Sequence, residues 1–220
     1  MLLYYITDRT QFAEDENTRR QVLLAKIADA ARWGVDFIQL REKDLAANEL
    51  ESLARAALGV VREQKPQTAG SGKPTRILIN SRVDVAIASG ADGVHLRSDD
   101  ISPRDVRKVW ERSALDGARE RSQPVIGVSC HTRSEVAAAR SEGADFVVFA
   151  PVFEKRETPG TVPSGLEPLG KACQENIPVI ALGGITLENA SSCLAAGAAG
   201  IAGIRLFQQG DIGTVVASLR

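Results

Sequence analysis

The sequence predicts a (β/α)8 TIM barrel, an α/β fold in which eight parallel strands alternate with helices. Three observations support this prediction. Short apolar runs alternate with longer segments of helical periodicity, and the chain has 220 residues, a common size for one such barrel. Four similar segments, GVDFIQL, GADGVHL, GADFVVF and GAAGIAGI, each follow an expected helix. We therefore expect residues 1–220 to form a single domain.

The expected strands are almost continuously apolar, as in a parallel sheet covered on both faces. They are Leu2–Thr7, Asp36–Leu40, Arg76–Asn80, Gly93–Leu96, Pro124–Ser129, Asp145–Phe149, Pro178–Leu182 and Gly200–Ile204. An open, doubly wound sheet is the rival fold, but the first strand–helix turn lacks the GxGxxG fingerprint of that class.

The expected helices have apolar residues at helical spacing, and a glycine follows several of them as a C-cap. They are Gln21–Trp33, Asn48–Arg62, Arg82–Ser89, Pro103–Trp110, Arg133–Ser141, Gly165–Glu175, Leu187–Ala196 and Ile212–Leu219. Ser102 before Pro103 is a favourable N-cap and first-turn pair.

Composition narrows the class of protein. The formal net charge of -1 gives no sign of a nucleic-acid partner, and no apolar run approaches the length of a membrane span. The start, MLLYYITDRT, has no basic n-region, so we expect a first strand and no signal peptide. Three cysteines, Cys130, Cys173 and Cys193, have no metal-like spacing and argue against a disulfide framework. We expect a cytoplasmic protein without membrane or nucleic-acid partners, and a homodimer stays open because barrels often dimerise.

Polar side chains gather where the expected strands end. In a barrel these ends converge on one active site. The residues are Thr7, Asp8, Gln39, Arg41, Glu42, Lys43, Asn80, Ser81, Arg82, His95, Arg97, Asp99, Asp100, Ser129, His131, Gly183, Gly184 and Arg205. Strand ends are commonly polar, but that does not explain why both histidines of the chain and so many cations are among them.

Two segments predict phosphate binding. Arg41 and Lys43 place two cations at one strand end, which suits a di- or triphosphate, unless Glu42 neutralises them as a salt-bridged rim. Gly183-Gly184 would let the backbone approach an anion, with Arg205 nearby to add a charge. The alternative for the glycines is a tight turn.

The metal and proton-transfer candidates are less specific. Asp99 and Asp100, with Asn80 nearby, offer the oxygen ligands that Mg²⁺ takes together with substrate phosphates, but acids also simply favour the start of a helix. His131 is either a proton-transfer group or a hydrogen-bonding residue of the rim. Cys130 and His131 are adjacent on a strand and face opposite ways, so they predict no nucleophile–base pair.

Several motifs come in the order and spacing of one family: YYITDR, QLREK, LINSRVDVA, ADGVHLRSDD, GVSCHT, FAPVF, GLEPL and ALGGIT. The chain resembles the thiamine phosphate synthases and their thiazole tautomerase relatives over nearly its whole length, and the synthases most. That resemblance implies a transferase that joins hydroxymethylpyrimidine diphosphate to a (carboxy)thiazole phosphate and releases pyrophosphate. It implies Gln39, Arg41, Lys43 and Asn80 around the pyrimidine diphosphate, Ser129 on the pyrophosphate, Gly184 on the thiazole phosphate, and Asp100 on Mg²⁺.

Three positions depart from the family pattern. Ser81 stands where a second metal-binding aspartate is usual, and Arg205 stands where a serine is usual. The loop lysine after the sixth strand is missing, and Lys155 or Arg156 is expected to replace its charge. These departures keep two alternatives open. One is a thiazole tautomerase, in which His131 would move the proton, and the other is a non-catalytic barrel that binds thiamine precursors.

Overall fold

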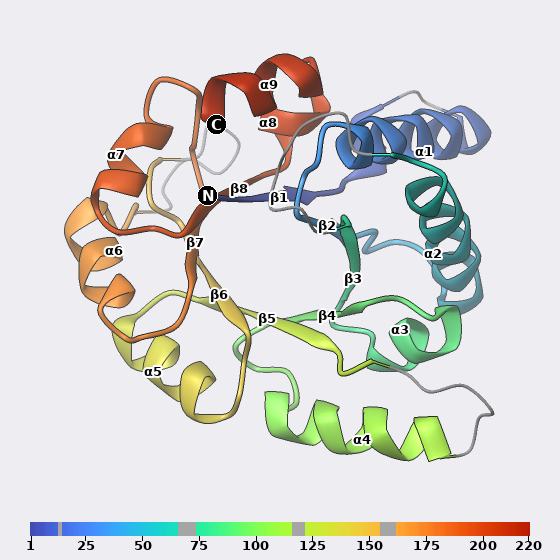
Figure 1. The fold of residues 1–220 in the computed structure, drawn as a ribbon, viewed down its shortest axis with the longest axis horizontal. Coiled ribbons are helices and arrows are strands. Elements are labelled where there is room, and N and C mark those ends of the chain that lie inside the picture. Colours follow the sequence, from blue (N-terminus) through green and yellow to red (C-terminus); the bar gives the residue numbers. More distant parts are fainter. Residues whose placement is uncertain (13–14, 66–73, 116–121, 155–161) are drawn as a thin grey trace.

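The strands form one closed parallel barrel in chain order (Figure 1). The computed structural model describes residues 1–12, 15–65, 74–115, 122–154 and 162–220. Within these ranges the strands are β1 (Leu2–Ile6), β2 (Phe37–Leu40), β3 (Arg76–Asn80), β4 (Gly93–Leu96), β5 (Val125–Cys130), β6 (Phe146–Phe149), β7 (Val179–Ala181) and β8 (Gly200–Gly203). The pairing of β1 with β8 closes the ring, so the TIM-barrel prediction is confirmed.

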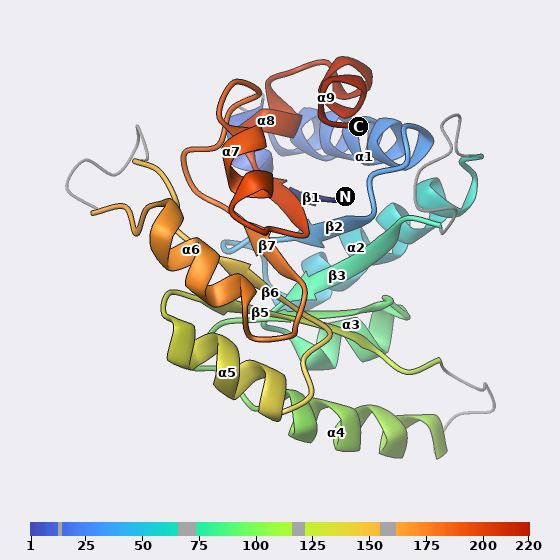
Figure 2. The ribbon, with the colours of Figure 1, turned by 60° about the vertical axis from the view of Figure 1, so that its left-hand side comes forward.

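Helices surround the barrel (Figures 1 and 2). They are α1 (Glu16–Arg32), α2 (Ala47–Arg62), α3 (Val83–Ser89), α4 (Pro103–Leu115), α5 (Arg133–Ser141), α6 (Leu166–Cys173), α7 (Ala190–Ala195), α8 (Arg205–Gln208) and α9 (Ile212–Leu219), with a 3-10 turn, η1 (Arg9–Gln11), after β1. No helix in the described parts of the chain has both the length and the apolar character needed to cross a membrane.

Apart from shifts of one or two residues, four helices differ from the expected pattern. The fourth continues past Trp110 and ends at Leu115. The first begins at Glu16 and not at Gln21, because the Asp15 carboxylate accepts the Thr18 amide and caps it there. The seventh begins only at Ala190, because the Asn189 side chain bonds the Thr186 amide and the Gly184 carbonyl and makes a turn of this segment. The short α8 was not expected at all, since four residues are too few to show a helical period.

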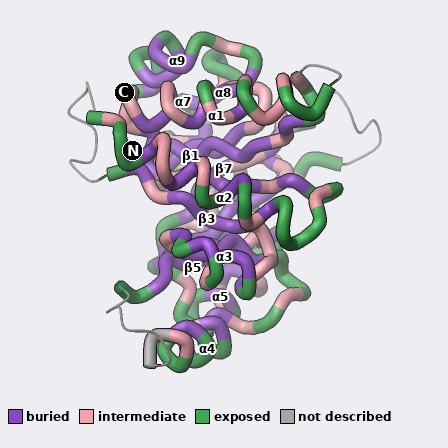
Figure 3. Tube along the Cα trace, turned by 90° about the vertical axis from the view of Figure 1, so that its right-hand side faces the viewer, coloured by how far each residue is buried: buried purple, intermediate pink, exposed green. Residues whose placement is uncertain are grey.

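The core has two layers. Inward-facing side chains fill the barrel, among them Tyr4, Phe146, Val148 and Ile180, while a larger cluster packs the outer strand faces against the helices. Figure 3 shows the buried chain at the centre and the exposed residues on the outer helices. The barrel interior is therefore a packed core, and only its open end can bind a ligand.

The recurring Gly-Ala/Val-Asp segments secure the amino ends of the strands. The carboxylates of Asp36, Asp92 and Asp145 accept the amides of Leu3, Ile77 and Ile126, respectively. In each case an aspartate before an even strand bonds the strand that precedes it. These contacts lie at the end of the barrel opposite the strand termini that carry the candidate site.

Candidate active site

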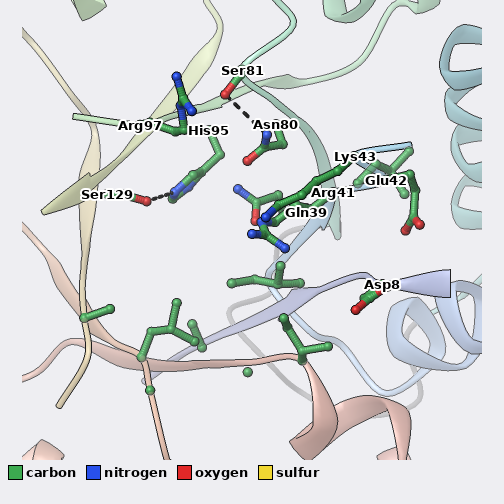
Figure 4. Close-up of a pocket in the computed structure, with 18 of the residues that line it drawn as sticks. Asp8, Gln39, Arg41, Glu42, Lys43, Asn80, Ser81, His95, Arg97 and Ser129 are labelled. Atoms are coloured by element: carbon green, nitrogen blue, oxygen red, sulfur yellow. Dashed lines mark hydrogen bonds between the residues drawn. The ribbon is translucent and has the colours of Figure 1, made fainter. Parts of the chain in front are cut away.

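A cavity of about 1360 Å³ opens at the carboxyl ends of the strands (Figure 4). Its deepest lining is apolar and includes Ile6, Leu182 and Ala202. Of the predicted site residues, those that line it are Gln39, Arg41, Lys43, Asn80, Ser129, His131, Gly184 and Arg205. Asp100 lies beside it, and Lys155 falls outside the described residues, as does Arg156. The topology thus brings together side chains that are far apart in sequence.

Arg41 and Lys43 are not neutralised by Glu42. The Glu42 carboxylate is buried and turned away from the cavity, where it accepts the backbone amide of Arg9 at 3.0 Å, the Arg9 guanidinium at 3.3 Å and the Thr7 hydroxyl. Among the described residues, no hydrogen bond or ion pair engages the guanidinium of Arg41. The salt-bridged rim is therefore wrong, and Arg41 faces the cavity as an open cation (Figure 4).

Arg9 anchors this strand end. It is 3% exposed and also pairs with Asp44 at 2.7 Å and Glu16 at 2.8 Å, so these carboxylates raise the pKa of its guanidinium. The Thr7 hydroxyl oxygen accepts the Arg41 amide at 3.1 Å. Arg9 was not among the residues predicted from the sequence. The segments TDR and LREKD nevertheless contain Arg9 and the two carboxylates that it pairs with, Glu42 and Asp44.

Gln39 presents an unsatisfied donor. Its side chain is 1% exposed, and its Nε2 atom has no hydrogen-bond partner among the described residues. A buried amide without a partner costs about 1–3 kcal/mol, so such a group is usually paired by a ligand or water. Asn80, on the next strand, lines the same part of the cavity and donates to the Ser81 hydroxyl at 3.3 Å. This wall is suited to a polar heterocycle or phosphate oxygen that accepts hydrogen bonds.

A buried histidine supports Ser129. His95 contacts the Tyr4 hydroxyl through Nδ1 at 3.0 Å and the Ser129 hydroxyl through Nε2 at 2.8 Å. Burial, with a smaller contribution from Arg41, lowers the pKa of His95 to about 3. Burial also raises the pKa of Tyr4. All three groups are therefore neutral at pH 7, and His95 is a satisfied inner residue.

Asp100 has the position expected of a metal ligand, but few companions. One carboxylate oxygen accepts the Ser81 hydroxyl at 2.7 Å and the Arg97 amide at 2.8 Å, and the other lies 3.5 Å from the Arg97 guanidinium. No group of three or more metal-ligating side chains occurs within the described ranges. One carboxylate still fits Mg²⁺ when phosphate oxygens and water complete its coordination.

Gly183 and Gly184 are required by packing. Their φ angles are 102° and 62°, and a Cβ at Gly184 would lie 2.3 Å from the Glu154 carbonyl oxygen. The turn expected as the alternative explanation is thus present. The helix that completes this end of the barrel is α8, which begins at Arg205, and Gln208 ties it to the backbone of Asp8 by bonds of 2.7 and 3.0 Å. Loops after strands seven and eight, with a short extra helix, are the usual phosphate site of a barrel.

His131 faces the cavity and Cys130 does not. The Nδ1 atom of His131 lies 2.6 Å from the Ala150 carbonyl oxygen, which can only accept, so Nδ1 carries a proton. Cys130 is fully buried under the helices, and burial raises its thiol pKa to about 12. The two residues are not a nucleophile–base pair, as the strand alternation predicted.

Several known proteins are similar to this chain over most of its length. The family model described as thiamine monophosphate synthase matches residues 3–207. The chain belongs to that family. A Geobacter sulfurreducens protein is 42% identical over 91% of this chain and 83% of its own length. The thiamine-phosphate synthase of Roseiflexus sp. is 37% identical over 91% of this chain and 75% of its own length. The solved thiamine phosphate pyrophosphorylase of Pyrococcus furiosus has a TM-score of 0.77 and 28% identity, covering 100% of this chain and 93% of that one.

In this member of the thiamine monophosphate synthase family, the cavity is lined by Gln39, Arg41, Lys43, Asn80 and Ser129. The sequence placed His95 among the strand-end residues, but it did not predict that His95 joins Tyr4 to Ser129. The predicted strand-end residue Arg97 pairs its guanidinium with Asp99 at 3.2 Å, beside Asp100.

Proposed function

We propose that this protein is a thiamine phosphate synthase. It joins hydroxymethylpyrimidine diphosphate to a thiazole phosphate and releases pyrophosphate, together with carbon dioxide where the thiazole carries a carboxylate. The observation that carries the proposal is one cavity lined by anion-binding groups from separate strand ends: Arg41 and Lys43 after β2, Ser129 on β5, Gly184 after β7 and Arg205 after β8. Separate groups of this kind would allow two phosphorylated substrates to bind in the same cavity. The family match and the synthases among its relatives support the same function.

The reaction breaks the bond between the pyrimidine methylene carbon and the diphosphate oxygen. Negative charge grows on the departing diphosphate, so positioned cations and donors lower the barrier. Arg41 and Lys43 would bind the diphosphate oxygens, and Ser129 would donate to one of them. Gln39 and Asn80 would hold the pyrimidine, while Gly184 and Arg205 would hold the thiazole phosphate. Lys155 or Arg156 would supply the positive charge of the loop lysine that is usual in the family after the sixth strand.

We also propose Mg²⁺ as the cofactor. Asp100 would hold it, and bound Mg²⁺ would supply charge neutralisation for the diphosphate. The Ser81 hydroxyl and the Arg97 amide fix the orientation of the Asp100 carboxylate. With one carboxylate the site depends on phosphate oxygens for its remaining ligands. Mg²⁺ is therefore expected to bind weakly to the free protein and more tightly together with pyrophosphate.

The test is pyrophosphate release by purified protein given both thiamine precursors, with Mg²⁺ or with EDTA. Mg²⁺-dependent release with an equal amount of thiamine phosphate is expected. If pyrophosphate is released in the presence of both precursors but no thiamine phosphate forms, the transferase proposal is contradicted. Binding of both precursors without any turnover would instead indicate the non-catalytic barrel.

A second candidate function rests on His131. His131 lines the cavity and its Nδ1 is engaged by the Ala150 carbonyl, which leaves Nε2 as the ring nitrogen for proton transfer, while Ser81 stands where a second metal-binding carboxylate is usual. Both features suit a thiazole tautomerase that moves a ring proton and needs no pyrophosphate. Proton NMR of the thiazole carboxylate phosphate with this protein alone decides between the two. Isomerisation without pyrophosphate release, lost in His131→Gln, would establish the tautomerase in place of the synthase.

A further inference from the structure

The buried chain of Tyr4, His95 and Ser129 has a defined direction. Tyr4 is 0% exposed and packs edge-on against the stacked rings of Phe37 and Phe146, whose centroids lie 5.9 and 5.5 Å from its own. The only described acceptor within reach of its hydroxyl is Nδ1 of His95, at 3.0 Å. A buried hydroxyl proton is rarely left without an acceptor, so Tyr4 donates and Nδ1 accepts.

The tautomer of His95 follows from this bond. A neutral imidazole carries one N–H, and with Nδ1 accepting, that proton is on Nε2. Nε2 then donates to the Ser129 oxygen at 2.8 Å. No other bond to the Ser129 hydroxyl is found in the described part of the chain, so its own proton is directed into the cavity that it lines. The reverse direction would leave the Tyr4 proton buried and unpaired.

We propose that Tyr4 and His95 are positioning residues that present Ser129 to the substrate as a hydrogen-bond donor only. The inference deepens the proposed function and rests on it for the identity of the anion, a diphosphate oxygen. Ser129 acts here neither as a base nor as a nucleophile, because Nε2 of His95 already donates to its oxygen and cannot accept its proton. A donor fixed before the substrate arrives needs no reorientation as charge develops on the leaving group.

Space around His95 is shaped for this arrangement. A Cβ at Gly127 would lie 2.4 Å from the Phe146 ring and 3.0 Å from Nδ1 of His95. A glycine at this position therefore leaves room for both rings. The hydrogen-bonded chain of Tyr4, His95 and Ser129 joins β1, β4 and β5. Its direction therefore depends on the barrel strands and not on the loops.

The direct test is nitrogen-15 NMR of the histidine rings in protein without a histidine tag. The chain has 2 histidines, so a His131→Gln sample assigns the remaining signals to His95. We expect the Nε2–H tautomer between pH 6 and 8, and a mixture of tautomers in Tyr4→Phe. A dominant Nδ1–H tautomer in the wild-type protein would overturn the inference.

Pyrophosphate binding in the presence of Mg²⁺, measured by calorimetry, gives the second test. Ser129→Ala should weaken binding by about tenfold, the usual effect of one hydrogen bond to a charged group, and Tyr4→Phe by less. In the double variant the Tyr4→Phe change should cause no further loss, because it acts through Ser129. An equal loss in both backgrounds would mean that Tyr4 has only a structural role. If the wild-type protein binds no pyrophosphate, the proposed function fails. The NMR result still decides the direction of the hydrogen bonds from Tyr4 through His95 to Ser129.

Discussion

Arg41 shows how a residue acquires its role from a neighbour that points the other way. Glu42 pairs with Arg9 and Thr7 behind the strand, and this leaves the guanidinium of Arg41 open to the cavity. Arg41→Ala should therefore lower kcat/KM about 30-fold or more, equivalent to about 2 kcal/mol of lost transition-state binding. Arg41→Lys should fall between, because it keeps the charge and loses the planar fork. Steady-state kinetics check this, and an unchanged kcat/KM in Arg41→Ala would remove Arg41 from the site.

Ser81 permits a test of the weak metal site. Its φ is 58°, in the left-handed region that aspartate and asparagine tolerate better than most residues, and its hydroxyl lies 2.7 Å from Asp100. Ser81→Asp adds a second carboxylate there, so the Mg²⁺ concentration for half-maximal activity should fall about tenfold. Without Mg²⁺ the two carboxylates repel, so the variant should melt below the wild-type protein in EDTA. Ser81→Asn is the matched control without charge, and an equal gain in that variant would exclude a metal effect.

At the scale of elements, the aspartates of the internal repeat stabilise the barrel at a place that is separate from the active site. Asp92 accepts the buried Ile77 amide at 2.7 Å, and burial raises the pKa of its carboxyl. The hydrogen bond is thus favourable while the charge is costly. Asp92→Asn keeps an acceptor and should stay within about 0.5 kcal/mol of the wild-type protein, whereas Asp92→Ala leaves the amide unpaired and should cost about 1–3 kcal/mol. Urea unfolding measures both, and equal stability of the two variants would contradict the role of the hydrogen bond.

Both variants should retain kcat, because Asp92 lies at the end of the barrel away from the cavity. The fourth copy of the repeat has Ala199 at the aspartate position, and no such side-chain bond is possible there. The β7–β8 unit therefore relies on backbone pairing, with the Ala199 amide on the Val179 carbonyl at 2.8 Å.

The same scale shows what the sequence could and could not predict. Periodicity and glycine caps predicted all the strands, because each buried strand needs a continuous apolar run. They did not predict α8, which is one turn long, or the late start of α7, which depends on the side chain of Asn189. The cavity residues were predicted because parallel strand ends must meet. Their supports were not, because Tyr4 contacts His95 across 91 residues and only the register of the barrel brings them together.

At the scale of the whole molecule, the burial of His95 inside the barrel makes the stability of the fold depend on pH in the acid range. Its ring is packed with Tyr4 and Phe146, and the nearest charges acting on it are Arg41, which lowers its pKa, and Asp100, which raises it slightly. The folded pKa of about 3 lies below the value of 6.5 for an unperturbed histidine. A neutral histidine is thus favoured by folding, and its contribution is present above pH 6.5 and is lost as the pH falls toward 3.

Acid should therefore unfold the wild-type barrel in part through His95. Between pH 7.5 and 5 this one group should remove about 2 kcal/mol from the free energy of unfolding, since the unfolded chain takes up a proton that the folded chain refuses. Urea unfolding at the two pH values measures the loss, and His95→Gln serves as the reference because it cannot titrate. That variant is expected to be less stable at pH 7.5 but to lose about 2 kcal/mol less on acidification. Parallel losses in the two proteins would show that His95 is protonated in the folded state, and a histidine NMR titration of the wild-type protein would then show a midpoint above pH 5.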